Sequence, residues 1–262
     1  AHKLFKRGHK MAQERKAYTI VHKNLRGLSL TQLRMGLLEE AEQSLQQLWQ
    51  SCNQHEDNYS KALYYLYHGI FMLQKNDLEL TENRIVLAIQ MFQKNELYKL
   101  AAEGMNLLGD IHRSRENLDQ AHTQYTRSLK LMTKINHPDQ DIPLLNIAII
   151  MSIKNLHQQV FDTISPLINT FKKQKKISKL LAALLLLLPY FNLKKMWSDW
   201  DHTIEQIEDL LLSTVYAEND IGMLLEQEAS RLAQKKQKDR AKKCWNLADE
   251  MWIRLGDEGQ TD

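Results

Sequence analysis

Apolar and polar positions along the chain repeat with a period of 40 positions. Three successive copies place a small residue at one phase, a second small residue twelve positions later, and a large residue four positions after that. The three sets are Ser29, Ala41 and Leu45, then Gly69, Thr81 and Ile85, then Gly109, Ala121 and Tyr125. The same phases return far downstream at Ala229, Ala241 and Trp245. A period of this size predicts stacked units that bury their apolar faces against their neighbours.

Each copy reads as a helical hairpin. In the third copy, Met105, Leu108 and His112 follow helical spacing, and a second helical pattern runs from Ala121 to Met132. A polar stretch centred on Glu116 separates the two patterns and suits a tight turn, as do Gly36 and Asn76-Asp77 in the earlier copies. The small residues predict that the paired helices approach closely there, and that Tyr125 and Trp245 fill the wider gap beyond.

The fourth and fifth copies support each other. The set Val160, Ile164, Leu167 and Phe171 returns one period later as Trp200, Ile204, Ile207 and Leu211, one residue out of phase with the first three copies. One residue is therefore lost before Val160 and recovered in the sixth copy. Pro166 predicts a kink or a late helix start in the fourth copy, because proline lacks an amide donor and clashes with the preceding turn. Pro189 predicts the end of the first helix of the fifth copy.

The pattern also extends to the start of the chain, where Ala1 and Phe5 occupy the phase of Ala41 and Leu45. We interpret this stretch as the second helix of a preceding repeat in a longer protein; the alternative is a capping helix. The sequence thus predicts one continuous domain. Its segments are an orphan or capping helix at 1–16, repeats at 17–56, 57–96, 97–136, 137–175, 176–215 and 216–256, and a tail at 257–262.

The third copy resembles a tetratricopeptide repeat. Its segment Met105-Asn-Leu-Leu-Gly-Asp-Ile-His112, followed by Ala121, Tyr125 and Ser128, matches the family's Leu-Gly, Ala, aromatic and small positions. The family's unit is usually about 34 residues long, so a period of 40 implies longer helices or turns. His112 replaces the usual aromatic residue, and most copies lack the late proline. The resemblance implies an all-α fold, a right-handed superhelical α-solenoid of stacked helix-turn-helix repeats.

Composition agrees with long helices and short turns, since the 262 residues include only 9 Gly and 4 Pro. The net charge of +3 is too small to indicate a nucleic-acid partner. Two basic runs, 172–176 and 235–243, are interpreted as solvated turns, with a phosphate-binding patch as the alternative. The apolar stretch Leu180–Leu188 is too short to span a bilayer and predicts a buried helix. No membrane partner is expected.

The two cysteines, Cys52 and Cys244, lie far apart in a solenoid and are expected to be reduced. With no secretory signal at the start of the chain, this favours a cytoplasmic location. No metal-binding pair of His or Cys, phosphate loop or serine elbow is present in the sequence. His68 and His112 are interpreted as structural. We therefore expect no enzyme activity, no cofactor and no metal.

The resemblance implies that partners bind in a concave groove lined by the first helices. The polar positions that match the family's groove positions are Lys23, Arg26, Arg34, Glu103, Asn106, Asp110, Arg113, Asn146 and Lys154. In the second copy the same positions are apolar, with Leu66, Ile70 and Leu73 forming a predicted floor for a hydrophobic ligand side chain.

Asn106 and Asn146 are one full period apart and predict a ladder of amides that clamps the backbone of an extended peptide. The alternative is that they are polar residues facing water. Tyr67 and Ile70 stand where a clamp for a chaperone's acidic tail needs polar residues, so that ligand is not expected.

Two function classes remain. The first is a non-enzymatic protein-interaction scaffold within a larger signalling or transcriptional regulator, with another protein or a domain of its own chain as partner. The second is a sensor whose groove binds a short peptide or ligand and changes the superhelix. Self-association through the exposed ends of the solenoid is a third, weaker hypothesis.

Overall fold

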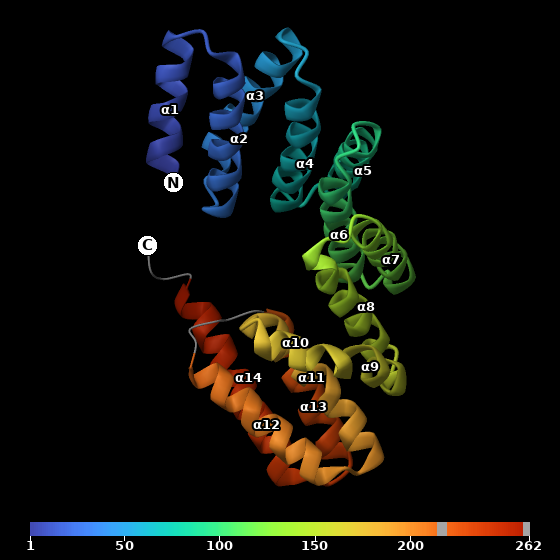
Figure 1. Ribbon diagram of the computed structural model, residues 1–262. Coiled ribbons are helices and arrows are strands. Elements are labelled where there is room, and N and C mark those ends of the chain that lie inside the picture. Colours follow the sequence, from blue (N-terminus) through green and yellow to red (C-terminus); the bar gives the residue numbers. More distant parts are fainter. Residues whose placement is uncertain (214–218, 259–262) are drawn as a thin grey trace. The chain divides into compact units, whose positions relative to one another are not determined.

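The computed structural model describes residues 1–213 and 219–258, and every regular element within these ranges is a helix (Figure 1). The helices follow one another in packed antiparallel pairs, as the all-α repeat prediction required. Contacts divide the chain into two compact units, residues 1–140 and residues 141–262. The unit boundary falls near the start of the fourth predicted repeat. Whether the repeats behave as one domain stays a prediction.

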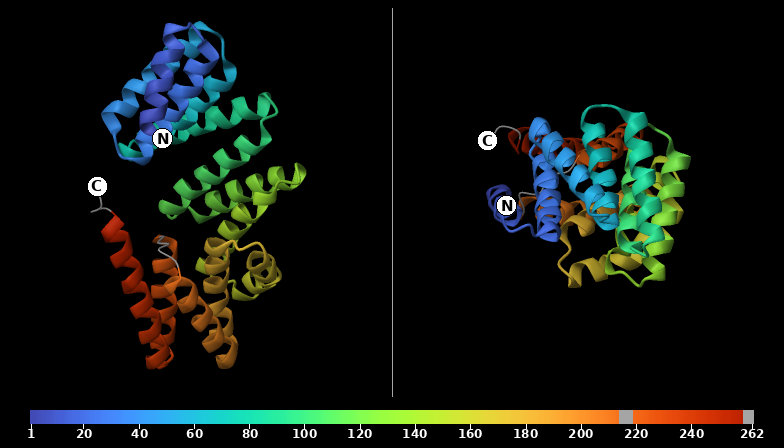
Figure 2. Two further views of the ribbon diagram at one scale, coloured as in Figure 1. Left: turned by 60° about the vertical axis from the view of Figure 1, so that its left-hand side comes forward. Right: turned by 90° about the horizontal axis from the view of Figure 1, so that it is seen from above.

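Unit 1 contains seven α-helices among its described residues, and each packs against the next (Figures 1 and 2). The first helix, α1 (His2–Glu14), covers the residues predicted as an orphan or capping helix. Three hairpins follow within the predicted repeats: α2 (Tyr18–Arg34) with α3 (Leu38–Gln54), α4 (Asn58–Gln74) with α5 (Leu78–Lys94), and α6 (Tyr98–Ser114) with α7 (Leu118–Lys134). The short 3₁₀ helix η1 (Pro138–Gln140) ends the unit.

Unit 2 is less regular in its first hairpin. There α8 (Asp141–Ile153) pairs with a broken second helix, which consists of α9 (His157–Ile164), η2 (Ser165–Leu167) and α10 (Ile168–Lys173). The later pairs are α11 (Ile177–Lys194) with α12 (Trp197–Leu212), and α13 (Asn219–Gln234) with α14 (Lys238–Glu258). The predicted tail begins inside α14, and residues 259–262 lie outside the described residues.

The turns between helices share one backbone conformation. One residue in each described turn has a positive φ, between 50° and 69°, and these residues are 20 positions apart through most of the chain. They are Lys16, Gly36, Glu56, Asn76, Glu96, Glu116, Asn136, Asn155, Lys175, Lys195 and Lys236. The following amide donates to a carbonyl five residues earlier, as from Asn117 to His112 at 2.9 Å. This pattern is a Schellman helix end, which satisfies the last carbonyls of one helix and reverses the chain.

The spacing of these turn residues locates the phase slip. It is 20 from Lys16 to Asn136, falls to 19 between Asn136 and Asn155, and returns to 20 at Lys175 and Lys195. Lys195 and Lys236 are 41 positions apart, which is one more than two intervals of 20. The lost residue is therefore recovered between them. The prediction of a slip before Val160 is confirmed, and the short segment contains α8.

Close approach at the small residues is also confirmed in the third copy. A Cβ atom added to Gly109 would lie 2.5 Å from Cε1 of Tyr125, and Ala121 and Tyr125 are fully buried. The expectation for Trp245 was wrong, because its side chain is 42% exposed. In the sixth copy the indole of Trp252 packs at Gly222 instead. An aromatic ring still fills the space beside a glycine, but it comes from a later turn of α14.

The two prolines had different outcomes. Pro166 lies in η2, where the second helix of its hairpin changes to a 3₁₀ turn, so the predicted break is confirmed. Pro189 lies inside α11, which continues to Lys194, so the predicted helix end was wrong. The helix ends at Lys195, whose φ of 57° is left-handed. Dense packing around Pro189, which is itself buried, holds the helix together across the missing donor.

Unit 2 is organised around α11. Leu184 to Leu188 are all buried in a cluster that includes residues of α8, α9, α12, α13 and α14. By length and apolarity alone, α11 is the one helix among the described residues that could cross a membrane. It is longer than the nine-residue stretch considered in the sequence, but 61% of its residues are buried inside the unit. Burial on several sides is the property of a core helix.

A buried carboxylate links three helices of unit 2. Glu228 of α13 is 1% exposed, and its Oε1 accepts hydrogen bonds from Asn192 Nδ2 of α11 at 2.9 Å and Trp200 Nε1 of α12 at 3.1 Å. Lys235 Nζ donates to Asn192 Oδ1 at 2.9 Å and extends the network. Burial raises the pKa of Glu228, and the two hydrogen bonds act in the opposite direction.

Candidate protein-interaction surface

The first helices of unit 1 bring several predicted residues together around Tyr67 of α4. Arg26 and Arg34 of α2 and Glu103 of α6 are all close enough to act on the Tyr67 phenol. Burial is the largest effect and raises the pKa of Tyr67, while the two arginines lower it and Glu103 raises it. Tyr67 also packs against apolar clusters that include residues of α2 and Ala101 of α6, so it lies between the neighbouring first helices. We call the surface around Tyr67 the first-helix surface and define it by Lys23, Arg26, Arg34, Tyr59, Tyr67, Glu103 and Asn106.

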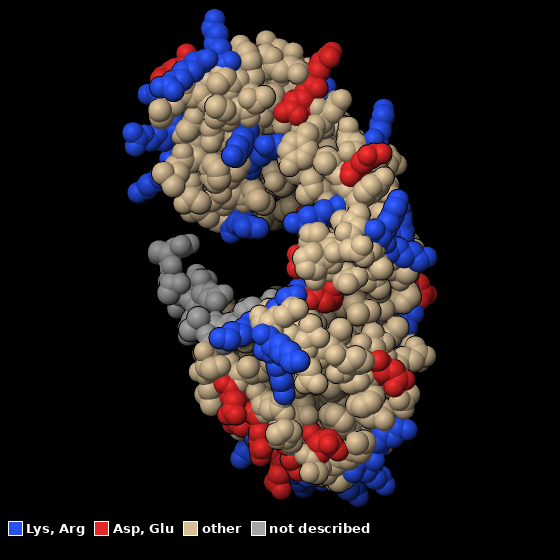
Figure 3. Space-filling model, in the orientation of Figure 1, with Lys and Arg blue, Asp and Glu red and all other residues tan. Residues whose placement is uncertain are grey.

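Arg26 is held in place by the next first helix. Its guanidinium lies 4.7 Å from the ring centroid of Tyr59, and Nη1 donates to Ser60 Oγ at 3.3 Å. A guanidinium stacked on an aromatic ring keeps its remaining donors available to a partner. Lys23 and Arg34 are exposed on the same helix. Figure 3 shows Lys and Arg side chains over α2 in unit 1.

Of the polar residues predicted on α6, Glu103 and Asn106 have contacts within α6, whereas Asp110 and Arg113 interact with α7. Glu103 is exposed and pairs with Lys99 at 3.5 Å, and Asn106 Nδ2 donates to Asp110 Oδ2 at 3.5 Å. Asp110 also accepts a 2.7 Å hydrogen bond from Tyr125 of α7, and Arg113 acts on the same phenol. Asp110 and Arg113 thus help to fix α7 against α6.

The apolar residues predicted as a groove floor are partly buried. Leu66 and Leu73 pack against a cluster formed by α5 and α6, and Ile70 packs against the cluster of α2, α3 and α4. Much of each side chain is therefore used to hold neighbouring hairpins together. A role for the remaining exposed atoms in ligand binding stays a prediction.

The last two predicted residues belong to unit 2. Asn146 is partly buried in α8, and Lys154 is exposed just after that helix. Asn106 is in unit 1, so the proposed asparagine ladder joins residues of two separately described units and stays a prediction.

Sequence reasoning missed the contribution of Tyr59 and treated Tyr67 only as a departure from a chaperone-tail clamp. The available signal was the concentration of rings in α4, where Tyr64, Tyr65 and Tyr67 lie between Tyr59 and Phe71. A helix with rings on several sides has more aromatic surface than one hairpin core can bury.

The two histidines interpreted as structural differ. His112 is buried, with Nε2 3.9 Å from Glu82 Oε1. His68 is partly buried, and its Nδ1 has no hydrogen-bond partner among the described residues. Burial, followed by the nearby Arg84, lowers the pKa of His68 to about 4. Its imidazole is therefore neutral at neutral pH.

A hydrogen-bonded Ser–His–Asp chain links α2, α3 and α4. Nδ1 of the buried His22 is 2.7 Å from Asp57 Oδ2, and Nε2 is 2.9 Å from Ser51 Oγ. Asp57 also caps α4 by accepting from the Ser60 amide at 2.9 Å. Ser51 lies inside α3, where backbone amides are used in helical hydrogen bonds and do not form an oxyanion hole. The arrangement ties three helices together.

Other sites considered from the sequence have structural explanations. In the two basic runs, Lys176, Arg240 and Lys243 form ion pairs with Asp141, Asp201 and Glu208, and Lys172 donates a hydrogen bond to Gln206, so part of the positive charge is matched within unit 2. Both cysteines are buried, and burial raises the pKa of the Cys52 thiol to about 11. The described residues contain no group of three or more His, Cys, Asp or Glu side chains arranged for a metal ion.

Comparison with known proteins identifies the architecture. No family model and no curated protein matches the sequence. Among solved structures, the apo form of RapI superposes with a TM-score of 0.70 at 9% identity, covering 98% of this chain and 99% of that chain. The chain is similar to RapI in fold. BtubC (BKLC) from P. vanneervenii gives a TM-score of 0.52 at 10% identity over 97% of this chain and 90% of that chain. Both matches support a tetratricopeptide-like helical-repeat fold.

Proposed function

We propose that this chain is a non-enzymatic protein-interaction scaffold, and that its first-helix surface binds an extended segment of a partner protein in the cytoplasm. The observation that carries the proposal is the packing of Tyr67 against two apolar clusters, one with residues of α2 and the other with Ala101 of α6. Repeat folds present side chains from successive units along one continuous face, which suits an extended ligand. The extended segment can belong to a separate protein or to another domain of the parent protein.

The chemistry of the first-helix surface indicates what the segment contains. The α2 side is basic through Lys23, Arg26 and Arg34, and the α6 side contributes Glu103 and Asn106. A segment with a carboxylate near Arg26 and backbone groups near Asn106 would match these donors and acceptors. Tyr59 and Tyr67 of α4 supply rigid aromatic surface between the α2 side and the α6 side. Tyrosine is one of the residue types that contribute most binding energy at protein interfaces.

The test is a selection from a random peptide display library on the full chain, followed by affinity measurements on the selected peptides. The double variant Arg26→Ala/Arg34→Ala is expected to bind about tenfold more weakly, since ~1.4 kcal/mol corresponds to that factor. The control Lys94→Ala/Lys130→Ala removes the same charge from exposed positions on second helices and should bind normally. Equal affinity of both variants would contradict the proposal. The unfolding midpoints of both variants check that the fold is intact.

A further inference from the structure

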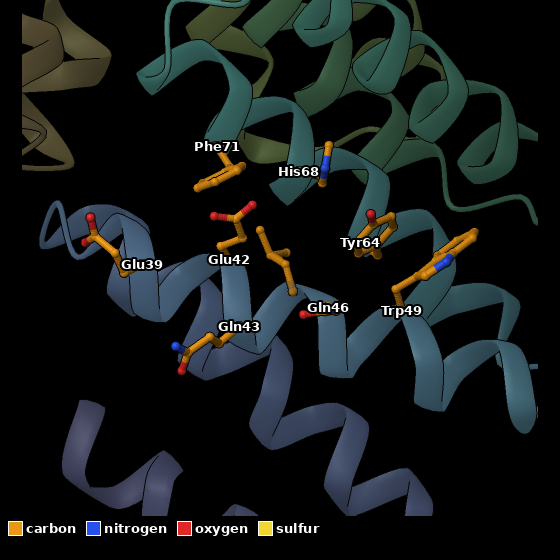
Figure 4. Close-up of a pocket in the computed structure, with 9 residues that line it drawn as sticks. Glu39, Glu42, Gln43, Gln46, Trp49, Tyr64, His68 and Phe71 are labelled. Carbon is orange, nitrogen blue, oxygen red and sulfur yellow. The ribbon is translucent and has the colours of Figure 1, made fainter.

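A pocket separate from the first-helix surface lies between α3 and α4. It has a volume of about 480 Å³ and is lined by Glu39, Glu42, Gln43, Leu45, Gln46, Trp49, Tyr64, His68 and Phe71 (Figure 4). At about 100° per helical residue, Tyr64, His68 and Phe71 lie on the side of α4 opposite to Leu66, Ile70 and Leu73. The pocket shares no lining residue with the first-helix surface.

The pocket combines aromatic faces with carboxylates. The ring centroids of Trp49 and Tyr64 are 4.7 Å apart, and Phe71 lies further along α4. Glu39 and Glu42 project from α3, and Glu42 extends toward α4 (Figure 4). Because the pKa of His68 is lowered to about 4, its imidazole adds no positive charge at neutral pH. Aromatic faces and carboxylates both attract cations.

The chain's own Lys75 already shows this preference. Its Nζ lies 4.7 Å from the Phe71 ring centroid and 3.5 Å from Glu42 Oε2. The two charged side chains are 45% and 60% exposed, so the ion pair is held weakly and can be exchanged for a better one.

From these contacts we propose that the pocket is a second binding site, which receives an arginine side chain of a protein partner in place of Lys75. A planar guanidinium can stack on an aromatic ring and donate two hydrogen bonds to one carboxylate, whereas the lysine ammonium supplies only a compact charge. Glu42 is exposed and provides the carboxylate, and the buried ring of Phe71 becomes available to a guanidinium when Lys75 leaves it. The proposal goes beyond the first-helix surface and does not depend on it.

The test uses N-acetyl-arginine amide as the probe and the full chain as the receptor. Trp49 is the only tryptophan before residue 197, so the fluorescence difference between the native chain and Trp49→Phe isolates the pocket signal. The neutral isostere N-acetyl-citrulline amide and the matched lysine amide serve as comparison ligands. The arginine amide should change Trp49 emission and bind at least about fivefold more tightly than either comparison ligand. Equal binding of the citrulline amide or of the lysine amide would overturn the assignment.

Charge-neutralising variants give a second, independent measure. Lys75→Gln removes the internal competitor and should strengthen binding of the arginine amide about threefold, whereas Glu42→Gln should weaken it by a similar factor. Lys94→Gln and Glu79→Gln make the same charge changes on α5 and should leave binding unchanged. If Lys75→Gln matches Lys94→Gln, the pocket does not exchange its cation and the proposal fails. Arg26→Ala/Arg34→Ala should retain arginine amide binding, which separates this proposal from the first.

Discussion

At the residue scale, the spacing of helices in a hairpin depends on which residue faces each small position. Gly109 faces the ring of Tyr125, whereas the first copy pairs Ser29 with Leu45 at the same phases. Both combinations are fully or almost fully buried. A larger side chain on one helix is thus matched by a smaller one on the other, so each pair forms a packing unit.

The first prediction concerns this pair. Gly109→Ala should destabilise the protein by about 1–3 kcal/mol, because the added Cβ would overlap the Tyr125 ring. Alanine is the better helix former by roughly 1 kcal/mol, so a net loss of stability isolates the packing effect. Urea unfolding monitored by circular dichroism provides the measurement.

A double variant supplies the control. Gly109→Ser with Tyr125→Leu reproduces the first-copy pair and should be more stable than the sum of the two single changes predicts, because the residues touch. Additive effects, or a Gly109→Ala protein as stable as the native one, would show that the pair is not coupled.

Whether the candidate surface binds a partner stays a prediction, and its aromatic centre was not part of the prediction from the sequence. Arg26, Arg34 and Glu103 were selected because they match groove positions of the tetratricopeptide family, and the charges of all three affect the pKa of Tyr67. The stacking of Arg26 on Tyr59 could not be predicted, because it depends on the rotation of α4 relative to α2. That rotation is set by packing across hairpins, which no single repeat encodes.

At the element scale, the left-handed turn residue determines where each helix ends. Glycine and asparagine occupy this conformation at low cost, but several turns use Glu or Lys. Glu116 has a φ of 61° between α6 and α7, and its amide donates to Arg113 O at 2.9 Å. The helix end is therefore formed despite an unfavourable side chain.

The corresponding prediction is that Glu116→Gly increases stability by about 1 kcal/mol, because glycine removes the steric cost of the positive φ. Lys130→Gly places the same residue at an exposed position inside α7 and should decrease stability by a similar amount. The two changes in unfolding free energy must have opposite signs. A loss of stability in both variants would mean that the turn conformation costs Glu116 nothing.

The prolines show why element boundaries were only partly predictable. Pro166 breaks a helix that has a partly exposed neighbourhood, and the local rule was sufficient there. Pro189 obeys no such rule, because α11 is enclosed by other helices whose packing outweighs one missing hydrogen bond. Local propensity fails where tertiary burial is greatest.

At the scale of the whole molecule, the regular rhythm of turns extends through most of the chain, but its first irregularity coincides with the boundary between the units. The shortened interval from Asn136 to Asn155 contains residue 141, where unit 2 begins. The sequence period therefore predicted the repeat architecture and the position of the slip. It did not predict that unit 2 would form around one enclosed helix, because that depends on how α8, α12 and α13 pack around α11.

The proposed function depends on partner binding by the first helices of unit 1. The most direct test is hydrogen–deuterium exchange of the full chain with and without a peptide selected by display. Exchange should slow in α2, α4 and α6 and remain unchanged in α5, α7 and residues 219–258. Protection confined to α5 and α7, or to unit 2, would contradict the claim.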